Sequence, residues 1–211
     1  MMDIETLDLH QERLQRVADL LLGSGARRVL DLGCGTGTLL QYLLRESQFE
    51  QLVGLELSGE LLAQAKMRFD TLSAEVRSRL ELVCGSYVDP PGGLADFDAA
   101  AMVESIEHVP PASLSRVERA VFAGLRPRLL VLTTPNREFN PLYGLAPGEF
   151  REPDHKFEWD RARFASWARG VASRNGYRVL LSGIGEWHPT LGQPTQLAQF
   201  IRQRADPAPA P

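Results

Sequence analysis

Several features are scarce in this chain, and each scarcity excludes a class of protein. Cysteine occurs only twice in 211 residues, as Cys34 and Cys84, far apart and in apolar or glycine-rich surroundings. This spacing argues against a disulfide framework or a thiolate metal site, and we expect both thiols to be small buried side chains. No run of about 18 apolar residues occurs, and the first twenty residues carry acidic and polar side chains throughout. The sequence therefore predicts no transmembrane helix, no secretory signal and no membrane partner, but a cytoplasmic location.

The chain also lacks an excess of basic charge. Its 23 Lys and Arg residues are outnumbered by 27 Asp and Glu residues, which gives a formal net charge of −4. General attraction to nucleic acid is thereby excluded, so any affinity for a polynucleotide must come from a local patch or a partner. The apolar fraction of 44% is ordinary for a globular protein. We expect one domain over residues 1–205 and a disordered tail at 206–211.

Short apolar runs alternate with amphipathic stretches along the chain, which is typical of a mostly parallel sheet with helices on both faces. We expect seven strands, at 27–33, 51–57, 80–85, 97–105, 128–134, 177–185 and 195–201. We expect helices at 38–46, 58–72, 113–125 and 160–176. A loop rich in proline and glycine runs from Pro135 to Pro153. The predicted fold class is therefore α/β, of the Rossmann-like type.

Ligands bind at the carboxyl ends of the strands in open parallel sheets. The first apolar run ends in DLGCGTG, whose glycines let the backbone turn sharply and approach a ligand at a helix start. A dinucleotide fingerprint would need a glycine where Thr38 stands, which disfavours a nicotinamide cofactor. Glu56 ends the second run and can accept hydrogen bonds from both hydroxyls of a ribose. These residues predict a nucleoside pocket; the alternative is a tight turn without a ligand.

At these residues the sequence resembles the class I S-adenosylmethionine-dependent methyltransferases, whose first motif has this acidic-residue-plus-glycines form. The resemblance implies the Rossmann-like methyltransferase fold and S-adenosylmethionine as the cofactor. It implies that Asp31, Gly33 and Gly35 surround the methionine part of the cofactor. It further implies that Glu56 holds the ribose and that Ser86, after the third strand, lies near the adenine.

The stretch VESIEHV, residues 103–109, places two carboxylates and an imidazole directly after the fourth apolar run. In a helical turn, Glu104, Glu107 and His108 would stand at i, i+3 and i+4 and share one face. Such a face repels itself unless a cation neutralises it. Oxygen and imidazole ligands suit manganese, iron or cobalt, whereas magnesium matches nitrogen less well and zinc stays allowed. The alternative is a solvated helix start, where acidic residues favour the helix dipole.

A fourth ligand has to come from elsewhere in the chain. His155, in REPDHKFEW, follows the long loop and stands beside Asp154. His10 and His188 lack comparable neighbours. We therefore predict His155 as the fourth ligand, the alternative being a surface ion pair with Asp154.

Three segments in this order, ESIEHVPP, LTTPNREFN and DHKFEW, resemble the family that methylates the 2′-hydroxyl of the 3′-terminal nucleotide of small RNAs. Plant microRNA, animal piRNA and bacterial RNA-repair methyltransferases belong to this family, and the resemblance extends from about Leu9 to Phe200. It implies one divalent ion, usually manganese or magnesium, in a catalytic site made of Glu104, Glu107, His108 and His155.

Two places depart from the family's pattern. A Pro-Pro-Leu segment often precedes the first helix of the domain, whereas LDLHQER stands here and leaves Arg13 to meet the terminal phosphodiester. Glu152 and Pro153 stand where bacterial relatives often have a second histidine upstream of DH. The stretch TTPN, residues 133–136, is expected to end a strand and form a turn. Asn136 within it is a candidate for orienting the RNA substrate.

The acceptor implied by this resemblance is a weak nucleophile at neutral pH. A divalent ion (Mn²⁺, or Mg²⁺ or Co²⁺) that contacts the 2′ and 3′ oxygens of the last ribose would activate the 2′-hydroxyl. The same contact would select RNA with a free 2′,3′-hydroxyl end. His108 or His155 would take the proton from the 2′-hydroxyl. Two alternatives stay open: a metal-dependent O-methyltransferase for a small diol or catechol, and a non-catalytic cofactor- or RNA-binding subunit. The chain is too short for the extra domains of plant and many bacterial relatives. We therefore expect a partner, such as an RNA-repair ligase or kinase or another RNA-binding protein.

Overall fold

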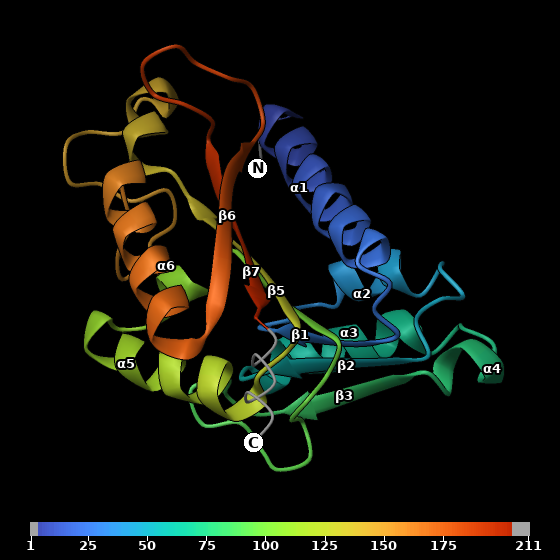
Figure 1. The fold of residues 1–211 in the computed structure, drawn as a ribbon. Helices are drawn as coiled ribbons and strands as arrows, with labels where there is room; N and C mark the ends of the chain where they lie inside the picture. Colours follow the sequence, from blue (N-terminus) through green and yellow to red (C-terminus); the bar gives the residue numbers. More distant parts are fainter. Residues whose placement is uncertain (1–3, 204–211) are drawn as a thin grey trace, which may run out of the picture.

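The computed structural model describes residues 4–203, with side chains from Asp8 onward. Its centre is one seven-stranded sheet in the order β3-β2-β1-β4-β5-β7-β6 (Figure 1). The strands are β1 (Arg28–Leu32), β2 (Gln51–Glu56), β3 (Leu80–Cys84), β4 (Ala99–Val103), β5 (Leu129–Pro135), β6 (Tyr177–Ile184) and β7 (Thr195–Arg202). Neighbours from β3 to β5 are parallel, and β7 is antiparallel to both β5 and β6. The predicted α/β fold with a mostly parallel sheet is confirmed.

Helices cover both faces of the sheet, as Figure 1 shows. One face is covered by α1 (Ile4–Gly23), α2 (Thr38–Leu43) and α3 (Gly59–Phe69), which share one apolar cluster with it. The other face is covered by α5 (Leu114–Val117), the π-helix η3 (Glu118–Leu125) and α6 (Arg161–Asn175). The remaining short elements are α4 (Ala74–Arg77) and the 3-10 segments η1 (Ile106–His108), η2 (Pro111–Ser113) and η4 (Arg137–Tyr143). Among residues 4–203, no helix has both the length and the apolar character that a membrane crossing requires.

The central strands are continuous apolar runs because they are buried on both faces. All seven residues of β5 are buried, as are the first four of β4. Between its two buried end residues, the edge strand β6 instead alternates between exposed and partly buried positions. Parallel strands covered on both faces are expected to differ from edge strands in this way. Because β1, β2, β4 and β5 are parallel, their carboxyl ends lie at the same edge of the sheet. The polar residues of the predicted site follow these strand ends.

Some elements differ from the expected ones. The helix expected at 113–125 is a short α-helix followed by wider turns, in which Arg126 N–H donates to the carbonyl of Val121 at 3.0 Å. The loop expected after Pro135 contains η4, and the LDLHQER segment lies inside α1. Cys34 is buried as expected, whereas Cys84 is exposed because it ends the edge strand β3, so that expectation was wrong. Both cysteines are free thiols.

The predicted single domain at 1–205 extends beyond the described residues at both ends and stays a prediction. The predicted disordered tail at 206–211 lies outside the part of the chain that the structure describes.

Candidate active site

The glycine-rich loop after β1 forms the first wall of the site. Gly33, Gly35 and Gly37 have φ angles of 84°, 54° and 79°, a region that residues with side chains disfavour. A Cβ at Gly33 would lie 2.9 Å from the Cβ of Ser105, and a Cβ at Gly37 would lie 2.6 Å from the ring of Phe69. A Cβ at Gly35 would meet no other atom within 4 Å, and Gly35 lines a cavity. The missing side chain of Gly35 therefore keeps space open for a ligand, while Gly33 and Gly37 allow Ser105 and Phe69 to pack closely against the loop.

Glu56, at the end of β2, supports this loop and lines the same cavity. Its carboxylate accepts hydrogen bonds from the N–H groups of Gly35 at 2.9 Å and Ser58 at 2.8 Å. The cavity has a volume of about 450 Å³, and Gly33 and Ser86 also line it. This volume lies within the range of small-molecule sites. The structure thus brings four of the five predicted cofactor residues together around one cavity.

Asp31, the fifth predicted cofactor residue, lies in β1 below the loop. Its side chain is buried, and its Oδ2 atom has no hydrogen-bond partner. Burial, and then the charge of Glu56, raise the pKa of Asp31 to about 7. A buried carboxylate without a partner fits a cationic group such as the ammonium of a methionine moiety. Asp31 is not among the cavity-lining residues, so its contact with the cofactor stays a prediction.

The acidic stretch follows β4 as an unusual turn rather than as an α-helix. Glu104 has a φ angle of 46°, a strained value for a residue with a side chain, and the chain then forms the single 3-10 turn η1. Glu107 is completely buried inside this turn. Its carbonyl accepts a hydrogen bond from the N–H of Lys156 at 2.8 Å, which brings the segment containing His155 alongside.

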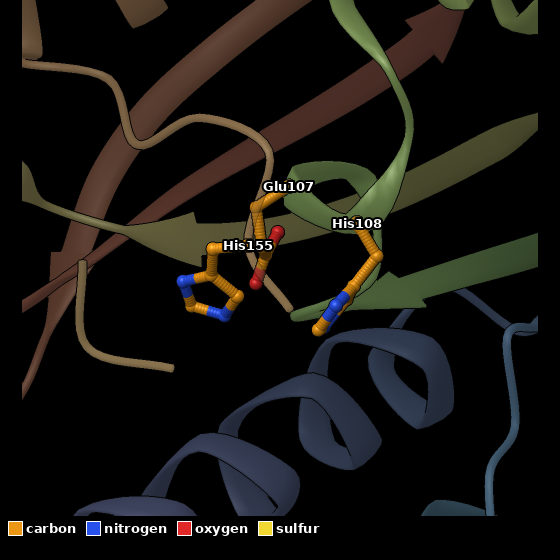
Figure 2. A group of neighbouring side chains, drawn as sticks. All are labelled: Glu107, His108 and His155. Atoms are coloured by element: carbon orange, nitrogen blue, oxygen red, sulfur yellow. The ribbon is translucent and has the colours of Figure 1, made fainter. Parts of the chain in front are cut away.

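Three of the four predicted metal ligands converge at this point. One ligand atom from each of Glu107, His108 and His155 lies within 4.8 Å of the other two. Figure 2 shows these three side chains next to one another. The two imidazole rings meet edge to face, with centroids 4.9 Å apart. His155 is buried, whereas the side chain of His108 is 38% exposed and lines the cavity next to the glycine-rich loop. The candidate cation cluster is therefore continuous with the candidate cofactor pocket.

Glu104 lies beside this cluster rather than within it. Its Oε1 atom is 3.4 Å from Nε of Arg13 and is buried without a hydrogen-bond partner. Glu104 nevertheless lines the cavity, and its charge acts on Glu107. The predicted role of Glu104 as a metal ligand therefore stays a prediction.

The electrostatics of Glu107 fit a bound cation. Burial, and then the carboxylate of Glu104, raise the pKa of Glu107 well above its usual range. The hydroxyl of Thr134 donates to Oε2 at 3.0 Å, while Oε1 is buried without a partner. The carboxylates of Glu104 and Glu107 beside two imidazoles form a donor set that suits a divalent ion. These residues therefore fit the predicted metal.

Each histidine of the cluster has its Nδ1 atom against a carboxylate. Nδ1 of His108 is 3.0 Å from Oδ2 of Asp154, and Nδ1 of His155 is 2.7 Å from Oε1 of Glu158. Contacts of this kind orient metal-binding imidazoles and leave Nε2 for the ion. Sequence reasoning identified Asp154 as a neighbour of His155 but missed Glu158, whose only signal was its position three residues after His155 in DHKFEW.

The two residues predicted to bind RNA are both buried in this structure. Arg13 donates from Nε and Nη2 to the hydroxyl of Thr195, at 3.3 and 3.1 Å, in addition to its ion pair with Glu104. Asn136 donates to the carbonyls of Leu191 and Gln193, both at 2.8 Å. Arg13 is therefore placed beside the candidate site. Contact of Asn136 with RNA stays a prediction that the geometry does not support.

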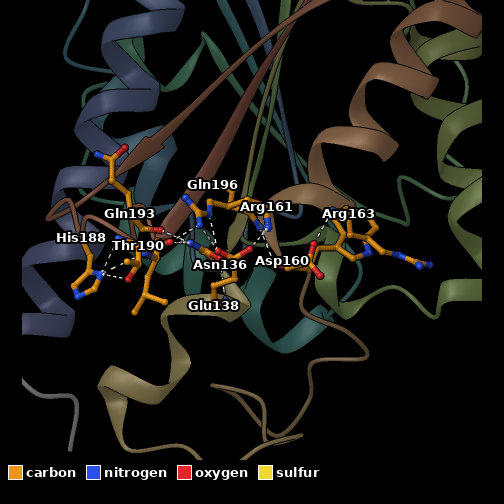
Figure 3. A network of polar contacts seen from close by, with 11 residues as sticks. Asn136, Glu138, Asp160, Arg161, Arg163, His188, Thr190, Gln193 and Gln196 are labelled. Atoms are coloured by element: carbon orange, nitrogen blue, oxygen red, sulfur yellow. Dashed lines mark hydrogen bonds and ion pairs between the residues drawn. The ribbon is translucent and has the colours of Figure 1, made fainter.

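Asn136 belongs to a network that joins three segments at the site edge of the sheet (Figure 3). Its Oδ1 accepts from the N–H of Glu138 at 3.0 Å and begins η4. The carboxylate of Glu138 accepts from Nε of Arg161 at 2.6 Å, and the same guanidinium donates to the carbonyl of Thr190. The end of β5, the start of α6 and the 185–194 loop are thus fixed to one another. Phe139, in η4, is buried, and its ring packs against that of His188 in the 185–194 loop.

Comparisons with known proteins agree with this geometry. Residues 29–128 match the family model described as a methyltransferase domain. The methyltransferase domain of bacterial CtHen1 is 38% identical, with 93% of this chain and 100% of that chain covered and a TM-score of 0.85. The small RNA methyltransferase HEN1 is 32% identical, with 95% of this chain and 26% of that chain covered and a TM-score of 0.86. The small RNA 2′-O-methyltransferase of Gallus gallus is 36% identical over 210 residues, which are 94% of this chain and 55% of that protein.

The chain spans about half the length of the first curated relatives that it matches. The bacterial methyltransferase domain is, in contrast, matched along its entire length and with the same fold. The chain therefore belongs to the Hen1 family of small-RNA 2′-O-methyltransferases.

Proposed function

We propose that this chain transfers the methyl group of S-adenosylmethionine to the 2′-hydroxyl of the 3′-terminal nucleotide of RNA, with the help of a divalent ion. One observation carries the proposal. His108, a member of the candidate cation cluster, lines the same cavity as Gly35 and Glu56. A methyl donor in that cavity and an acceptor held at the cluster would be neighbours, which is the arrangement that methyl transfer requires.

The residues around the cavity would hold the cofactor. S-adenosylmethionine supplies a sulfonium methyl that is already electrophilic, so the protein has mainly to position it. Glu56 would accept hydrogen bonds from the ribose hydroxyls, and the open space at Gly35 admits the methionine part. Asp31 would pair with the ammonium group, and Ser86 would lie at the adenine end.

Glu107, His108 and His155 would hold the ion, with Glu104 as the fourth ligand; Mn²⁺ is the first candidate, and Mg²⁺ and Co²⁺ belong to the same set. A divalent ion held by these residues would supply Lewis-acid activation of a hydroxyl group. The chain itself fixes the ligand directions. Thr134 holds one oxygen of Glu107, and carboxylates contact Nδ1 of both imidazoles.

Selection of the RNA end follows from this arrangement. If the site recognises both the 2′- and the 3′-hydroxyl, then a 3′-phosphate, a deoxy end and an internal nucleotide would be poor substrates. Arg13, which belongs to α1 and lies 3.4 Å from Glu104, would meet the terminal phosphodiester. The net charge of −4 provides no general attraction to RNA. We therefore also propose delivery by a partner, such as an RNA-repair ligase or kinase, in a cytoplasmic setting.

Transfer of labelled methyl groups tests the proposal. The acceptors are a short RNA with a free terminal diol, the same RNA after periodate oxidation, and a free catechol. We expect transfer to the intact RNA alone, with Mn²⁺ present, and loss of transfer on chelation. Equal transfer to oxidised RNA would contradict the proposed acceptor, and transfer to catechol alone would favour a small-molecule enzyme. RNA binding without transfer to any acceptor would indicate a non-catalytic subunit.

A further inference from the structure

Glu158 lies outside the cation cluster, yet three groups converge on its buried carboxylate. Oε1 contacts Nδ1 of His155 at 2.7 Å and accepts from the N–H of Arg151 at 2.7 Å. Oε2 accepts from the side-chain amide of Asn140 at 2.5 Å. Three hydrogen bonds on one buried carboxylate are more than a surface ion pair would make, and they fix the side chain in one place.

These contacts determine which nitrogen of His155 carries the proton. A backbone N–H and an amide NH₂ act only as donors, so Glu158 serves as an acceptor toward both. A carboxylate that only accepts requires the imidazole to donate from Nδ1, which leaves the lone pair on Nε2. In Figure 2, one ring nitrogen of His155 lies on the side away from Glu107 and His108, and the other lies nearer to them.

Glu158 also joins His155 to the loop that follows β5. Nε of Arg151 donates to Oδ1 of Asn140 at 2.8 Å, and its Nη2 donates to the carbonyl of Asn136 at 2.6 Å. Glu158 therefore stands at the centre of a set of contacts that includes the end of β5, η4 and the segment of His155. A change at Glu158 would be transmitted both to the imidazole and to this loop.

We propose that Glu158 is a positioning residue that holds His155 in the Nδ1-protonated form, with Nε2 presented to the divalent ion. This inference rests on the proposed metal site. Asp154, the corresponding contact of His108, is a useful contrast. The side chain of Asp154 is 68% exposed, whereas that of Glu158 is 0% exposed, so water competes with the first contact and not with the second. Glu158 should therefore have the larger influence on metal binding.

Two readouts test this role, and the first needs no metal. Long-range ¹H–¹⁵N correlation spectra of the metal-free protein report the tautomer of His155, and calorimetric titration with Mn²⁺ reports affinity. We expect the wild-type imidazole to be protonated at Nδ1. Glu158→Ala should abolish that preference and weaken Mn²⁺ binding by about 10- to 100-fold. Glu158→Gln keeps one acceptor oxygen for the three donors on His155, Arg151 and Asn140. This variant should weaken Mn²⁺ binding by about three- to tenfold.

A rescue variant tests the geometry itself. In Glu158→Gln the new amide faces the amide of Asn140, so two donors oppose each other. Adding Asn140→Asp supplies an acceptor at that point and keeps a partner for Nε of Arg151. We expect the double variant to regain the Nδ1-protonated form and Mn²⁺ affinity within about threefold of wild type.

Glu149 provides the matched control. It lies in the same loop, and within the described part of the chain its carboxylate accepts only from the nearby N–H of Ala146, at 2.7 Å, so Glu149→Gln should change neither readout. A folded Glu158→Ala protein with unchanged tautomer and unchanged affinity would overturn the inference. Should that variant not fold, unchanged affinity in Glu158→Gln would overturn it as well. A wild-type protein that binds no Mn²⁺ would refute the metal site, while the metal-free spectra would still decide the role of Glu158.

Discussion

Single residues in this protein bear an electrostatic cost that the fold itself does not offset. Asp31 and Glu107 each have a buried carboxylate oxygen without a hydrogen-bond partner, whereas the corresponding oxygen of Glu104 forms an ion pair with Arg13. Such a group costs several kcal/mol when charged, against a total stability of about 5–15 kcal/mol for a typical domain. Asp31 lies below the glycine-rich loop and Glu107 lies beside two histidines, so a cationic ligand at each place would offset the cost. The unligated protein should therefore gain stability when these charges are removed.

Glu107→Gln tests this at the cation cluster. The folded-state pKa of Glu107 is raised, so the metal-free protein is most stable below the ordinary carboxyl pKa and loses stability as pH rises toward the raised value. We expect the metal-free variant to be at least as stable as wild type at pH 8 in urea unfolding, because a neutral amide can still accept from Thr134. Its Mn²⁺ affinity should fall by more than about 100-fold. Retained Mn²⁺ affinity would contradict the assigned role.

Asp31→Asn tests the same principle at the cofactor. Because the pKa of Asp31 is raised from 3.8 to about 7, the free energy of unfolding should fall as pH rises between these values. The variant lacks this dependence, and we expect its ligand-free form to be more stable than wild type by about 2–4 kcal/mol at pH 8 but not at pH 4. Its affinity for S-adenosylhomocysteine should fall by about tenfold or more. Equal stability differences at both pH values would count against this account.

The sequence allowed the chemically distinctive residues to be predicted, but not the residues that hold them. Glu107, His108 and His155 were recognisable because carboxylates and imidazoles are costly near a core. Glu158 was not, because its importance depends on Asn140 and Arg151, which reach it only in the folded chain. Asn136 was expected to orient RNA, yet its amide is taken up by two carbonyls from the distant 185–194 loop.

At the scale of elements, the turns after the strands do most of the positioning. Gly33→Ala would place its Cβ 2.9 Å from Ser105 at a φ of +84°, whereas Gly35→Ala, at +54°, would meet no other atom within 4 Å. We expect Gly33→Ala to lower the free energy of unfolding by about 1–3 kcal/mol, and Gly35→Ala to lower it less. Gly35→Ala should instead weaken cofactor binding, because its methyl group would occupy the cavity. Calorimetry and urea unfolding of both variants measure the two effects separately, and the reverse pattern would refute the assignment.

The strands could be predicted more accurately than the turns and helix types. The strands β1 to β7 are apolar runs whose burial is decided by composition, and their expected ranges differ from the observed ones by only a few residues. The π-helix η3 could not be distinguished from an α-helix, because both have the same apolar pattern at this length. The positive φ of Glu104 has no counterpart in the sequence pattern either. That turn is what places Glu104 beside Arg13 instead of inside the cation cluster.

For the whole molecule, the sheet order accounts for the location of the site. The carboxyl ends of β1 and β4, adjacent in the sheet although separated by two strands in the sequence, supply the glycine-rich loop and the acidic turn. The fold could be predicted because alternating strands and helices have few packing solutions, whereas this adjacency also needed the resemblance to a known family.

Ligand binding should stabilise the whole molecule measurably. S-adenosylhomocysteine at about 100 times its dissociation constant contributes about 2.7 kcal/mol, which raises the Tm of a domain of this size by roughly 5–10 °C. Adding Mn²⁺ should raise the Tm further in wild type but not in Glu107→Gln, which serves as the control. An equal metal effect in both proteins would place the ion elsewhere.

The most direct test of the central claim is anomalous diffraction from crystals grown with Mn²⁺ and S-adenosylhomocysteine. We expect one manganese peak bonded to Glu107, His108 and His155, next to a cofactor that occupies the cavity lined by Gly35 and Glu56. A peak at another place, or a cofactor bound away from this cavity, would contradict the account.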